Sequence, residues 1–414
     1  MDEPQSSPET PEARLRTGLH AILPTNRFYA TKFHATNFAI EPIQNWPFTT
    51  KTELAEDQLT TPPYGRNQTC ERSDYSRLHQ TSGTTTGKPL RWLDTPSDWQ
   101  WLLGCWEWIF PKIGITKNDV AFFPFSFGPF LGFWTGFEAL TRNGGLCLPG
   151  GGMSSTTRLR FALEHYVTVM FATPTYAMHL IEVAAKEGID IVNSSVRTIV
   201  VAGEPGGGIA STRARIEAGW GAKVYDHYGM TEVGPVAVQT CDDDTGLTVN
   251  DTAFFTEVIE PGGDNATAAG EIGELVVSNL GRWGSPAIRY RTGDLVRAPE
   301  LGRTTTVLWG GILGRVDDMI YVRGNNIFPS SIESIIRRFD RVVEYRLRVE
   351  RSGSLADLRI EIEPLPGVDG SQISHAVAKA IQDELLFRVE VIAVEPGTLP
   401  RHEMKAKRLI VVQT

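Results

Sequence analysis

Short apolar runs alternate with helical patterns through the middle of this chain. The runs lie at residues 121–123, 146–148, 168–172, 198–202 and 223–226, and a helical pattern from about 175 to 187 separates two of them. Continuous apolar strands alternating with helices are typical of a parallel sheet that is covered on both faces. Ligands bind such sheets beyond the carboxyl ends of the strands, so we expect the chemistry in the loops that follow these runs.

The pattern changes on both sides of this region. Pro96-Ser97-Asp98 predicts the start of an aromatic helix, residues 245–311 are rich in strand patterns, and a small α+β pattern follows Asp317. Within it we predict helices at 328–338 and 371–386 and strands at 347–351, 358–362 and 389–394. The predicted fold is α/β: a large N-terminal domain of parallel sheets flanked by helices plus a β-rich, barrel-like portion, and a small mobile α+β C-terminal domain. The predicted boundaries are a disordered tail at 1–13, the large domain at 14–316 and the small domain at 317–414.

Composition narrows the class of protein. A chain of 414 residues is long enough for two or three domains, and 41% hydrophobic with 21% charged residues is ordinary for a globular protein in water. The net charge of -9 argues against a general nucleic-acid or anionic-membrane surface. The acidic N-terminus is unlike a signal peptide, and the apolar region from Phe122 to Phe137 is too short and too interrupted to span a bilayer. We expect a cytoplasmic protein with no nucleic-acid and no membrane partner.

The loop from Gln80 to Pro89 (Gln-Thr-Ser-Gly-Thr-Thr-Thr-Gly-Lys-Pro) has the composition of a phosphate-binding loop. Glycine allows close backbone approach, successive N–H groups form an anion-binding nest, and the hydroxyls and Lys88 add donors and a positive charge. It is not a Walker A loop, because three residues rather than four separate Gly83 from Gly87. Taken alone, the stretch is also compatible with a flexible Gly/Thr surface loop.

Four further stretches carry chemistry-bearing side chains. In 225–232, Tyr228 offers a ring for a base, Thr231 a hydroxyl for a phosphate and Glu232 a carboxylate for Mg²⁺. The alternative is a core tyrosine beside a solvated helix start. In 290–295, Asp294 is a candidate partner for the two hydroxyls of a ribose, or part of an Asp-containing turn. The stretches 314–324 and 399–408 lie at the predicted domain junction and near the C-terminus.

In this order, the five stretches resemble the core motifs of the adenylate-forming superfamily, which contains acyl-CoA synthetases, adenylation domains and firefly-type luciferases. The resemblance covers about residues 45–412. The chain also resembles the phenylacetate–CoA ligase subgroup at 47–51 (Pro-Phe-Thr-Thr-Lys), at 202–205 (Ala-Gly-Glu-Pro) and at 317–329 (Asp-Asp-Met-Ile-Tyr-Val-Arg-Gly-Asn-Asn-Ile-Phe-Pro). The resemblance implies that 14–316 bind ATP and an acid and that 317–414 form a lid.

The resemblance also implies a role for each matching residue. The β- and γ-phosphates of ATP would be held by Thr81, Ser82, Gly83, Thr84, Thr85, Thr86, Gly87 and Lys88, and the adenine would be lined by Gly203, Glu204, Pro205, Asp226, His227, Tyr228, Gly229 and Met230. Thr231 would touch the α-phosphate, Glu232 would bind Mg²⁺, and Asp294 with Arg315 would hold the ribose. Asp317 would be the hinge, Gly324 would line the approach of the thiol, and Lys405 would bridge the substrate carboxylate and the α-phosphate. Lys405, Thr231 and Glu232 are therefore the catalytic candidates.

These roles imply that a carboxylate attacks the α-phosphorus of ATP and that the acyl group then passes to a thiol. The carboxylate and the phosphates of ATP are both anionic, and Lys405 and Mg²⁺ would compensate their charges where they meet. A mobile small domain would then withdraw Lys405 before the thiol enters. We expect a small aromatic or similar acid as substrate and coenzyme A as the thiol. The alternatives are a carrier-protein phosphopantetheine as acceptor, adenylation of a non-carboxylate such as nitrite by a diazotase-like enzyme, and a non-catalytic nucleotide-binding protein.

Two further expectations concern the acid pocket and zinc. Phe127, Phe130, Trp134 and Tyr176 are candidates for an aryl-acid pocket, although such aromatic runs also pack protein cores. Some proteins of the subgroup carry a Cys/His zinc site near the position of Cys241. The four cysteines of this chain include no Cys-x-x-Cys pair and no histidine follows Leu247, so we expect no structural zinc.

Overall fold

The computed structural model of the chain describes residues 9–81, 89–240, 246–300, 302, 304–322, 325–352, 355–402 and 406–413. The chain divides into two compact units. The first combines Met1–Gly151 with His227–Gly311, and the second combines Gly152–Asp226 with Ile312–Thr414.

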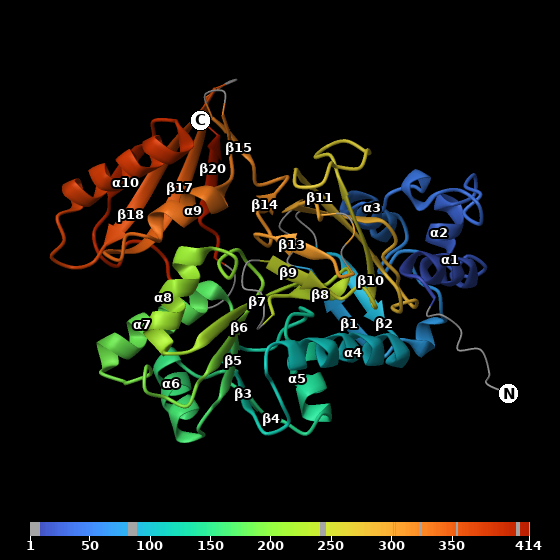
Figure 1. The fold of residues 1–414 in the computed structure, drawn as a ribbon, viewed down its shortest axis with the longest axis horizontal. Helices are drawn as coiled ribbons and strands as arrows, with labels where there is room; N and C mark the ends of the chain where they lie inside the picture. The colour runs from blue at the N-terminus through green and yellow to red at the C-terminus, as the bar shows by residue number, and fades with distance from the viewer. Residues whose placement is uncertain are drawn as a thin grey trace. The chain divides into compact units, whose positions relative to one another are not determined.

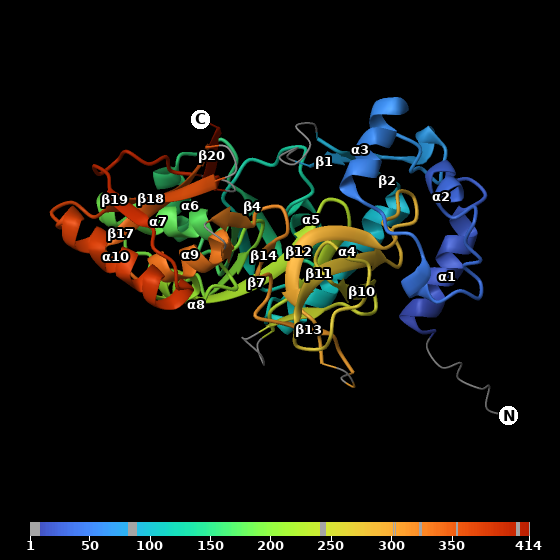
Figure 2. The ribbon, with the colours of Figure 1, turned by 90° about the horizontal axis from the view of Figure 1, so that it is seen from above.

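The first unit combines helices with strands that belong to more than one sheet (Figure 1). Its helices are α1 (Pro11–Ile22), α2 (Arg27–Lys32), α3 (Lys51–Thr60), α4 (Pro96–Lys112) and α5 (Trp134–Arg142). Its strands are β1 (Arg77–Gln80), β2 (Arg91–Asp94), β3 (Val120–Phe123), β4 (Leu146–Pro149), the last part of β7 (Lys223–Met230), β8 (Gly234–Val238), β9 (Gly246–Val249), β10 (Phe254–Ile259), β11 (Ile272–Asn279), β12 (Tyr290–Arg297) and β13 (Val307–Trp309). Helices α1 and α2 lie side by side at one end of this unit (Figure 2).

Strand pairing in the first unit mixes parallel and antiparallel ladders. β3 runs parallel to β4, whereas β10, β11 and β12 form an antiparallel sheet in that order. β8 pairs antiparallel with β9, β9 pairs antiparallel with β13, and β1 forms a hairpin with β2. The prediction of a strand-rich region at 245–311 is therefore confirmed.

Polar side chains determine where the long helices of this unit begin. Thr95 accepts a hydrogen bond from the backbone N–H of Asp98, and the Asp98 carboxylate accepts one from the N–H of Thr95. This reciprocal capping box satisfies two donors at the start of α4, and Thr50 and Glu53 do the same at α3. The predicted helix start at Pro96 is confirmed.

The second unit begins with an α/β segment. Its helices are α6 (Ser155–Glu164), α7 (Pro174–Glu187) and α8 (Ala210–Trp220), which lie beside β5 (Val169–Ala172), β6 (Thr198–Val201) and the first part of β7 (Figure 1). The three strands are parallel neighbours, as predicted. The Trp220 indole N–H donates to the Ala177 carbonyl at 3.0 Å and so joins α8 to α7.

Strand β7 is longer than the sequence pattern indicated. We predicted a strand that ends at Asp226, but β7 continues to Met230, pairing first in parallel with β6 and then antiparallel with β8. The second pairing extends the strand, because β8 supplies hydrogen bonds to residues 227–230. The apolar pattern of β7 does not predict this pairing. The stretch 225–230 therefore lies within a strand rather than after one.

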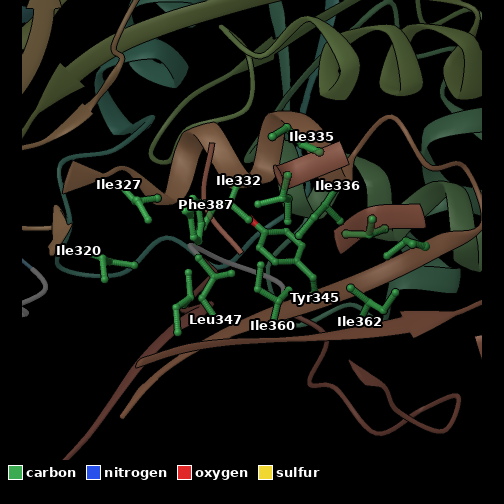
Figure 3. Packing of buried hydrophobic residues seen from close by; sticks show 14 of the residues in the cluster. Ile320, Ile327, Ile332, Ile335, Ile336, Tyr345, Leu347, Ile360, Ile362 and Phe387 are labelled. Carbon is green, nitrogen blue, oxygen red and sulfur yellow. The ribbon is translucent and has the colours of Figure 1, made fainter. Parts of the chain in front are cut away.

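The C-terminal part of the second unit is an α+β module with its own apolar core (Figure 3). Its elements are β14 (Gly314–Arg315), β15 (Ile320–Val322), β16 (Asn325–Ile327), α9 (Pro329–Ile336), β17 (Val342–Ser352), β18 (Leu355–Pro364), α10 (Gly370–Leu385), β19 (Glu390–Ala393) and β20 (Leu409–Gln413). The larger sheet has the order β19-β18-β17-β20. Ile332, Ile335 and Ile336 share one face of α9 and point toward the sheet, where Leu347 and Ile360 are fully buried. Full burial of each such side chain contributes about 1.5–3 kcal/mol.

Two of our predicted boundaries need correction. The tail predicted to be disordered through residue 13 is wrong for 11–13, because Thr10 caps α1 and Pro11 suits its first position. β17 and β18 extend beyond the predicted 347–351 and 358–362, since charged pairs such as Arg346 and Glu361 (Nε–Oε2, 2.5 Å) continue the ladder where the apolar pattern stops. A domain boundary at 317 stays a prediction.

In the part of the chain that the structure describes, no helix combines the length and the apolar character that crossing a bilayer requires. The cytoplasmic location stays a prediction.

The buried Glu344 carboxylate gives a first prediction. It accepts hydrogen bonds from Arg408 (2.7 and 3.0 Å) and Arg337 (3.2 Å), and the pKa of Glu344 is about 2 in the folded state because these two cations outweigh the cost of burial. A carboxyl whose pKa is lowered on folding stabilises the protein above its ordinary pKa of about 4.3, and this contribution is lost as the pH falls toward 2. Glu344→Gln should lower the free energy of unfolding by about 3 kcal/mol at pH 7.

The control for this prediction is Glu390→Gln, because Glu390 forms an exposed pair with Arg359 at 2.6 Å. Its cost should stay below about 1 kcal/mol. Denaturant unfolding at pH 7 and pH 3 measures both variants. A cost for Glu344→Gln that does not shrink at pH 3, or that is no larger than that of the control, would show that the carboxylate is not held as described.

Candidate functional site

Thr81 closes the base of the Thr/Gly loop. Its backbone N–H donates to the Leu90 carbonyl at 2.9 Å, and its hydroxyl accepts from the Leu90 N–H at 3.0 Å. These bonds extend the β1–β2 hairpin by one pair, to Thr81 and Leu90. Thr81 is buried, and its hydroxyl is engaged by the backbone.

Tyr228 and Asp294 come together from two strands. The Tyr228 hydroxyl, on β7, donates to Asp294 Oδ2, on β12, at 2.7 Å, and both residues are buried. The Asp294 backbone N–H donates to the Thr292 hydroxyl at 3.0 Å, which in turn donates to the Leu275 carbonyl. Asp294 therefore lies inside a strand, and the alternative of an Asp-containing turn is wrong. The geometry joins the residue predicted to face the adenine to the residue predicted to hold the ribose.

Thr231 and Glu232 lie between β7 and β8, where a buried arginine holds their backbone. The Arg282 guanidinium donates to the Thr231 carbonyl at 2.7 Å and to the Glu232 carbonyl at 3.3 Å. The same guanidinium forms two hydrogen bonds with Asp94, at 2.6 and 2.9 Å, with both side chains fully buried. This paired arrangement compensates both charges and keeps the turn in one position.

The Glu232 carboxylate is buried and has polar partners on two other elements. Its Oε1 accepts from the Tyr290 hydroxyl at 3.2 Å and lies 3.4 Å from Lys51 Nζ, at the start of α3. Such a carboxylate suits Mg²⁺, which is usually held by one or two carboxylates together with phosphate oxygens of a substrate. Among the described residues no cluster of three or more His, Cys, Asp or Glu could hold a metal by itself.

His227 points away from Tyr228, because successive side chains of a strand alternate. Its ring stacks on Trp106 with centroids 4.4 Å apart and lies 6.4 Å from Phe133. Neither ring nitrogen has a hydrogen-bond partner within the described residues. Burial lowers the pKa of His227 to about 3, so the imidazole is neutral at physiological pH.

Half-buried aromatic rings continue from this point. Phe125 lies 5.8 Å from Phe133 and 5.1 Å from Phe127, and Phe127 lies 4.4 Å from Trp134 (ring centroids). The Trp134 indole donates to the Gly128 carbonyl at 3.0 Å. Phe130 is 40% exposed and has no ring contact with any described residue. The structure thus groups Phe127 and Trp134 but leaves Phe130 outside their cluster.

Several predicted adenine residues lie in the second unit. Gly203 has a φ of 94°, which favours glycine, and Pro205 is exposed. A Cβ atom at Gly207 would come 2.4 Å from Asp226 Oδ1, so glycine is required for the loop to pass Asp226. The Glu204 carboxylate accepts from the backbone N–H groups of Thr175 at 2.8 Å and Ala406 at 2.7 Å.

Three other predicted residues of the second unit have well-defined partners. Arg315 Nε donates to Asp317 Oδ1 at 2.8 Å, so the predicted ribose cation and the predicted hinge form an ion pair. Tyr176 is buried, and its hydroxyl accepts from Arg158 at 2.6 Å and lies 3.1 Å from the Ser155 hydroxyl. These contacts favour a packing role for Tyr176.

Gly229 and Met230 end strand β7. A Cβ atom at Gly229 would lie 2.7 Å from the Gly234 carbonyl, so only glycine fits, and Met230 pairs with Gly234 across the hairpin. Predicted residues outside the described part of the chain are Ser82, Gly83, Thr84, Thr85, Thr86, Gly87, Lys88, Gly324 and Lys405; Cys241 is outside it as well.

Sequence reasoning did not assign roles to Arg282, Asp94, Lys51 or Tyr290. Arg282 and Asp94 are 188 positions apart, and neither lies in a recognisable motif. Lys51 and Tyr290 lie in two stretches that resemble family motifs, 47–51 and 290–295, and this resemblance was the sequence signal that could have indicated their contact with the site.

Comparison with known proteins places this geometry in a family. Residues 34–281 match the family model "AMP-binding enzyme", and residues 324–411 match "AMP-binding enzyme C-terminal domain". The phenylacetate-coenzyme A ligase of Escherichia coli (strain K12) is 30% identical over 403 residues, covering 92% of this chain and 88% of that protein.

Solved structures agree with this result. 2-Hydroxyisobutyryl-CoA ligase in the postadenylation state, in complex with 2-HIB-AMP, matches with a TM-score of 0.91 and 26% identity over 97% of this chain and 89% of that one. The same ligase with 2-HIB-AMP and CoA in the thioesterification state matches with a TM-score of 0.71 and 27% identity over 97% of this chain and 89% of that one.

The chain belongs to the family of AMP-binding enzymes. Within it, the predicted similarity to the phenylacetate–CoA ligases is confirmed. The predicted enzyme class, an AMP-forming acid–thiol ligase, is confirmed with it.

Two tyrosine variants should separate the predicted nucleotide site at Asp294 from the predicted metal site at Glu232. Tyr228→Phe removes the 2.7 Å hydrogen bond to Asp294, and Tyr290→Phe removes the 3.2 Å hydrogen bond to Glu232. A hydrogen bond to a charged group contributes about 1.5–3 kcal/mol, so we expect Tyr228→Phe to raise the Kd for ATP roughly tenfold or more at saturating Mg²⁺. Tyr290→Phe should instead raise the Mg²⁺ concentration needed for half-maximal ATP binding.

Isothermal titration calorimetry with ATP over a series of Mg²⁺ concentrations measures both effects. Each variant is the control for the other, because each loses one hydroxyl and keeps its ring. Equal responses of the two variants to Mg²⁺ would contradict the separate assignments of Asp294 and Glu232.

Proposed function

We propose that this protein adenylates a small aromatic carboxylic acid with ATP and transfers the acyl group to coenzyme A. The observation that carries the proposal is the Tyr228–Asp294 hydrogen bond beside the fixed Thr231–Glu232 turn, in a chain of the AMP-binding family. This arrangement supplies groups for the base on β7, for the α-phosphate and a metal in the turn after β7, and for the ribose on β12.

Each group has a defined part in the first half-reaction. Asp294 accepts hydrogen bonds from the ribose hydroxyls, and its position is fixed by Tyr228. Thr231 would offer a hydroxyl to the α-phosphate, and Glu232 would hold Mg²⁺, whose charge would neutralise the transferring phosphoryl group. Lys51 pairs with Glu232 at 3.4 Å, and its positive charge would be available to phosphate oxygens if Glu232 held a metal.

Lys405 supplies the second cation. Attack of the carboxylate oxygen on the α-phosphorus forms the acyl-AMP and releases pyrophosphate, so negative charge on both reactants must be compensated where they meet. In the second half-reaction the thiolate of coenzyme A attacks the acyl carbon and AMP leaves. In this proposal the aromatic rings select the acid that is adenylated.

The proposal of an aromatic acid rests on the cluster of half-buried rings. Phe125, Phe127 and Trp134 present ring surface, and an aryl ring gains about 0.5–1.5 kcal/mol per aromatic contact beyond its area burial. The neutral imidazole of His227 lies at the buried end of this series of rings.

The first test is substrate-dependent exchange of pyrophosphate into ATP with a panel of aryl acids. Lys405→Ala should reduce the exchange rate by at least ~10²-fold, because it removes a cation from the transition state. Unchanged exchange in that variant would contradict the role of Lys405.

The same assay separates the alternative acceptors and substrates. The panel includes 2-hydroxyisobutyrate as an aliphatic acid and nitrite with an aryl amine, and AMP release is followed with CoA, with a phosphopantetheinylated carrier protein and with neither. Thioester with CoA alone supports the proposal. Thioester with the carrier alone, or AMP from nitrite without any thiol, would replace it with the corresponding alternative.

Two phenylalanine variants test the acid pocket. Phe127→Ala removes a ring that contacts Trp134 and Phe125, so the KM for an aryl acid should rise roughly tenfold while the KM for ATP stays unchanged. Phe130→Ala is the matched control, because that ring lies 40% exposed outside the cluster. Equal KM values in wild type and Phe127→Ala, measured by pyrophosphate exchange, would show that the cluster only packs the core.

A further inference from the structure

The Glu204 carboxylate bridges two distant backbone N–H groups of the second unit. Oε1 accepts from Thr175 at 2.8 Å, and Oε2 accepts from Ala406 at 2.7 Å. The two donors are 231 positions apart in sequence (406 minus 175). Both carboxylate oxygens are thus engaged by protein, although the sequence motif suggested that Glu204 lines the adenine.

On one side, Glu204 serves the start of α7. Pro174 has no N–H, and the Tyr176 N–H is satisfied by the Thr173 hydroxyl, so the Thr175 N–H is the donor that needs a partner from elsewhere. A carboxylate at a helix N-terminus is also favoured by the helix dipole. The position of Glu204 is therefore fixed by α7.

On the other side, Glu204 holds the C-terminal segment. Ala406 directly follows the predicted catalytic Lys405 in sequence, and its backbone N–H donates to Glu204, so the hydrogen bond holds the chain at the residue after Lys405. A second contact lies nearby: Arg408 Nη2 donates to the Thr175 hydroxyl at 3.1 Å. The segment 406–408 is thus held at the start of α7 by one backbone and one side-chain hydrogen bond.

Other contacts between these parts have a different character. Arg401 Nε donates to Glu182 of α7 at 3.2 Å, with about a third of each side chain exposed. Exposed pairs of long side chains are weak and are screened by salt. The Glu204 contact differs because its donor is a backbone N–H, that of Ala406, rather than the end of a long side chain.

We propose that Glu204 is a positioning residue: it latches residues 406–408, which directly follow the predicted catalytic Lys405 in sequence, to helix α7 for the adenylation step. The proposal rests on the proposed function, since it assigns Lys405 to the first half-reaction. Loss of the latch lowers the population in which Lys405 is in place, so it should slow adenylation but not thioester formation from a preformed acyl-AMP.

The test uses the full chain with Glu204→Gln and Glu204→Ala. Pyrophosphate exchange measures adenylation, and conversion of synthetic acyl-AMP plus CoA measures the second half-reaction. We expect the exchange kcat to fall roughly 10- to 100-fold in Glu204→Ala and less in Glu204→Gln, because the amide oxygen still accepts one hydrogen bond. The KM for ATP and the thioester rate should stay within about twofold of wild type.

Glu182→Gln is the control, because it changes a carboxylate on α7 that accepts a hydrogen bond from the Arg401 side chain. A raised KM for ATP with unchanged kcat would assign Glu204 to the adenine and overturn the latch. If the rates of both half-reactions and the Tm all fell together, Glu204 would only cap α7, and the latch would be overturned as well. Absence of exchange in the wild type with every acid would contradict the proposed function itself, whereas an active wild type with unaffected Glu204 variants contradicts the latch alone.

Discussion

The hydrogen bond from Tyr228 to Asp294 is the contact on which the site in the first unit depends. It ties β7 to β12 at 2.7 Å, and both side chains are buried. Because side chains alternate along a strand, fixing Tyr228 toward Asp294 directs His227 to the opposite side, onto Trp106. The strand then ends at Met230, so Thr231 and Glu232 follow in the turn that Arg282 holds. One strand thus sets the positions of the residues that we propose for a nucleoside, a phosphate and a metal.

The buried charges near this turn serve placement more than stability. Arg282 and Asp94 are both fully buried, and such a pair gains little net stability over apolar side chains of the same volume. What the pair provides is a guanidinium whose remaining donor reaches the carbonyls of Thr231 and Glu232. Glu344 in the second unit is comparable: its carboxylate joins Arg337, at the C-terminal end of α9, and Arg408 near β20, so the C-terminal segment is anchored at Arg408 as well as at Ala406.

The sequence was sufficient for the fold class and for the residues that lie in local motifs. Parallel strands could be predicted because apolar runs and helices alternate, and Tyr228 and Asp294 could be predicted because each lies in a short characteristic stretch. The end of β7 could not, since its second half is created by pairing with β8. Arg282 and Asp94 could not either, because they meet only after folding from positions 188 apart. Glu204 was assigned from its motif to the adenine, and its contact with Ala406 depends on a partner 202 positions away.

Attack of a carboxylate oxygen on the α-phosphorus of ATP is the central claim, and an isotope measurement tests it directly. An acid that supports pyrophosphate exchange is labelled with ¹⁸O in its carboxyl group and incubated with the enzyme, ATP, Mg²⁺ and CoA. Mass spectrometry of the products should find a single ¹⁸O atom in AMP and none in pyrophosphate, because the bridging oxygen of the acyl-AMP stays with AMP when the thiol attacks the acyl carbon. Unlabelled AMP, or label in inorganic phosphate, would contradict the adenylation chemistry.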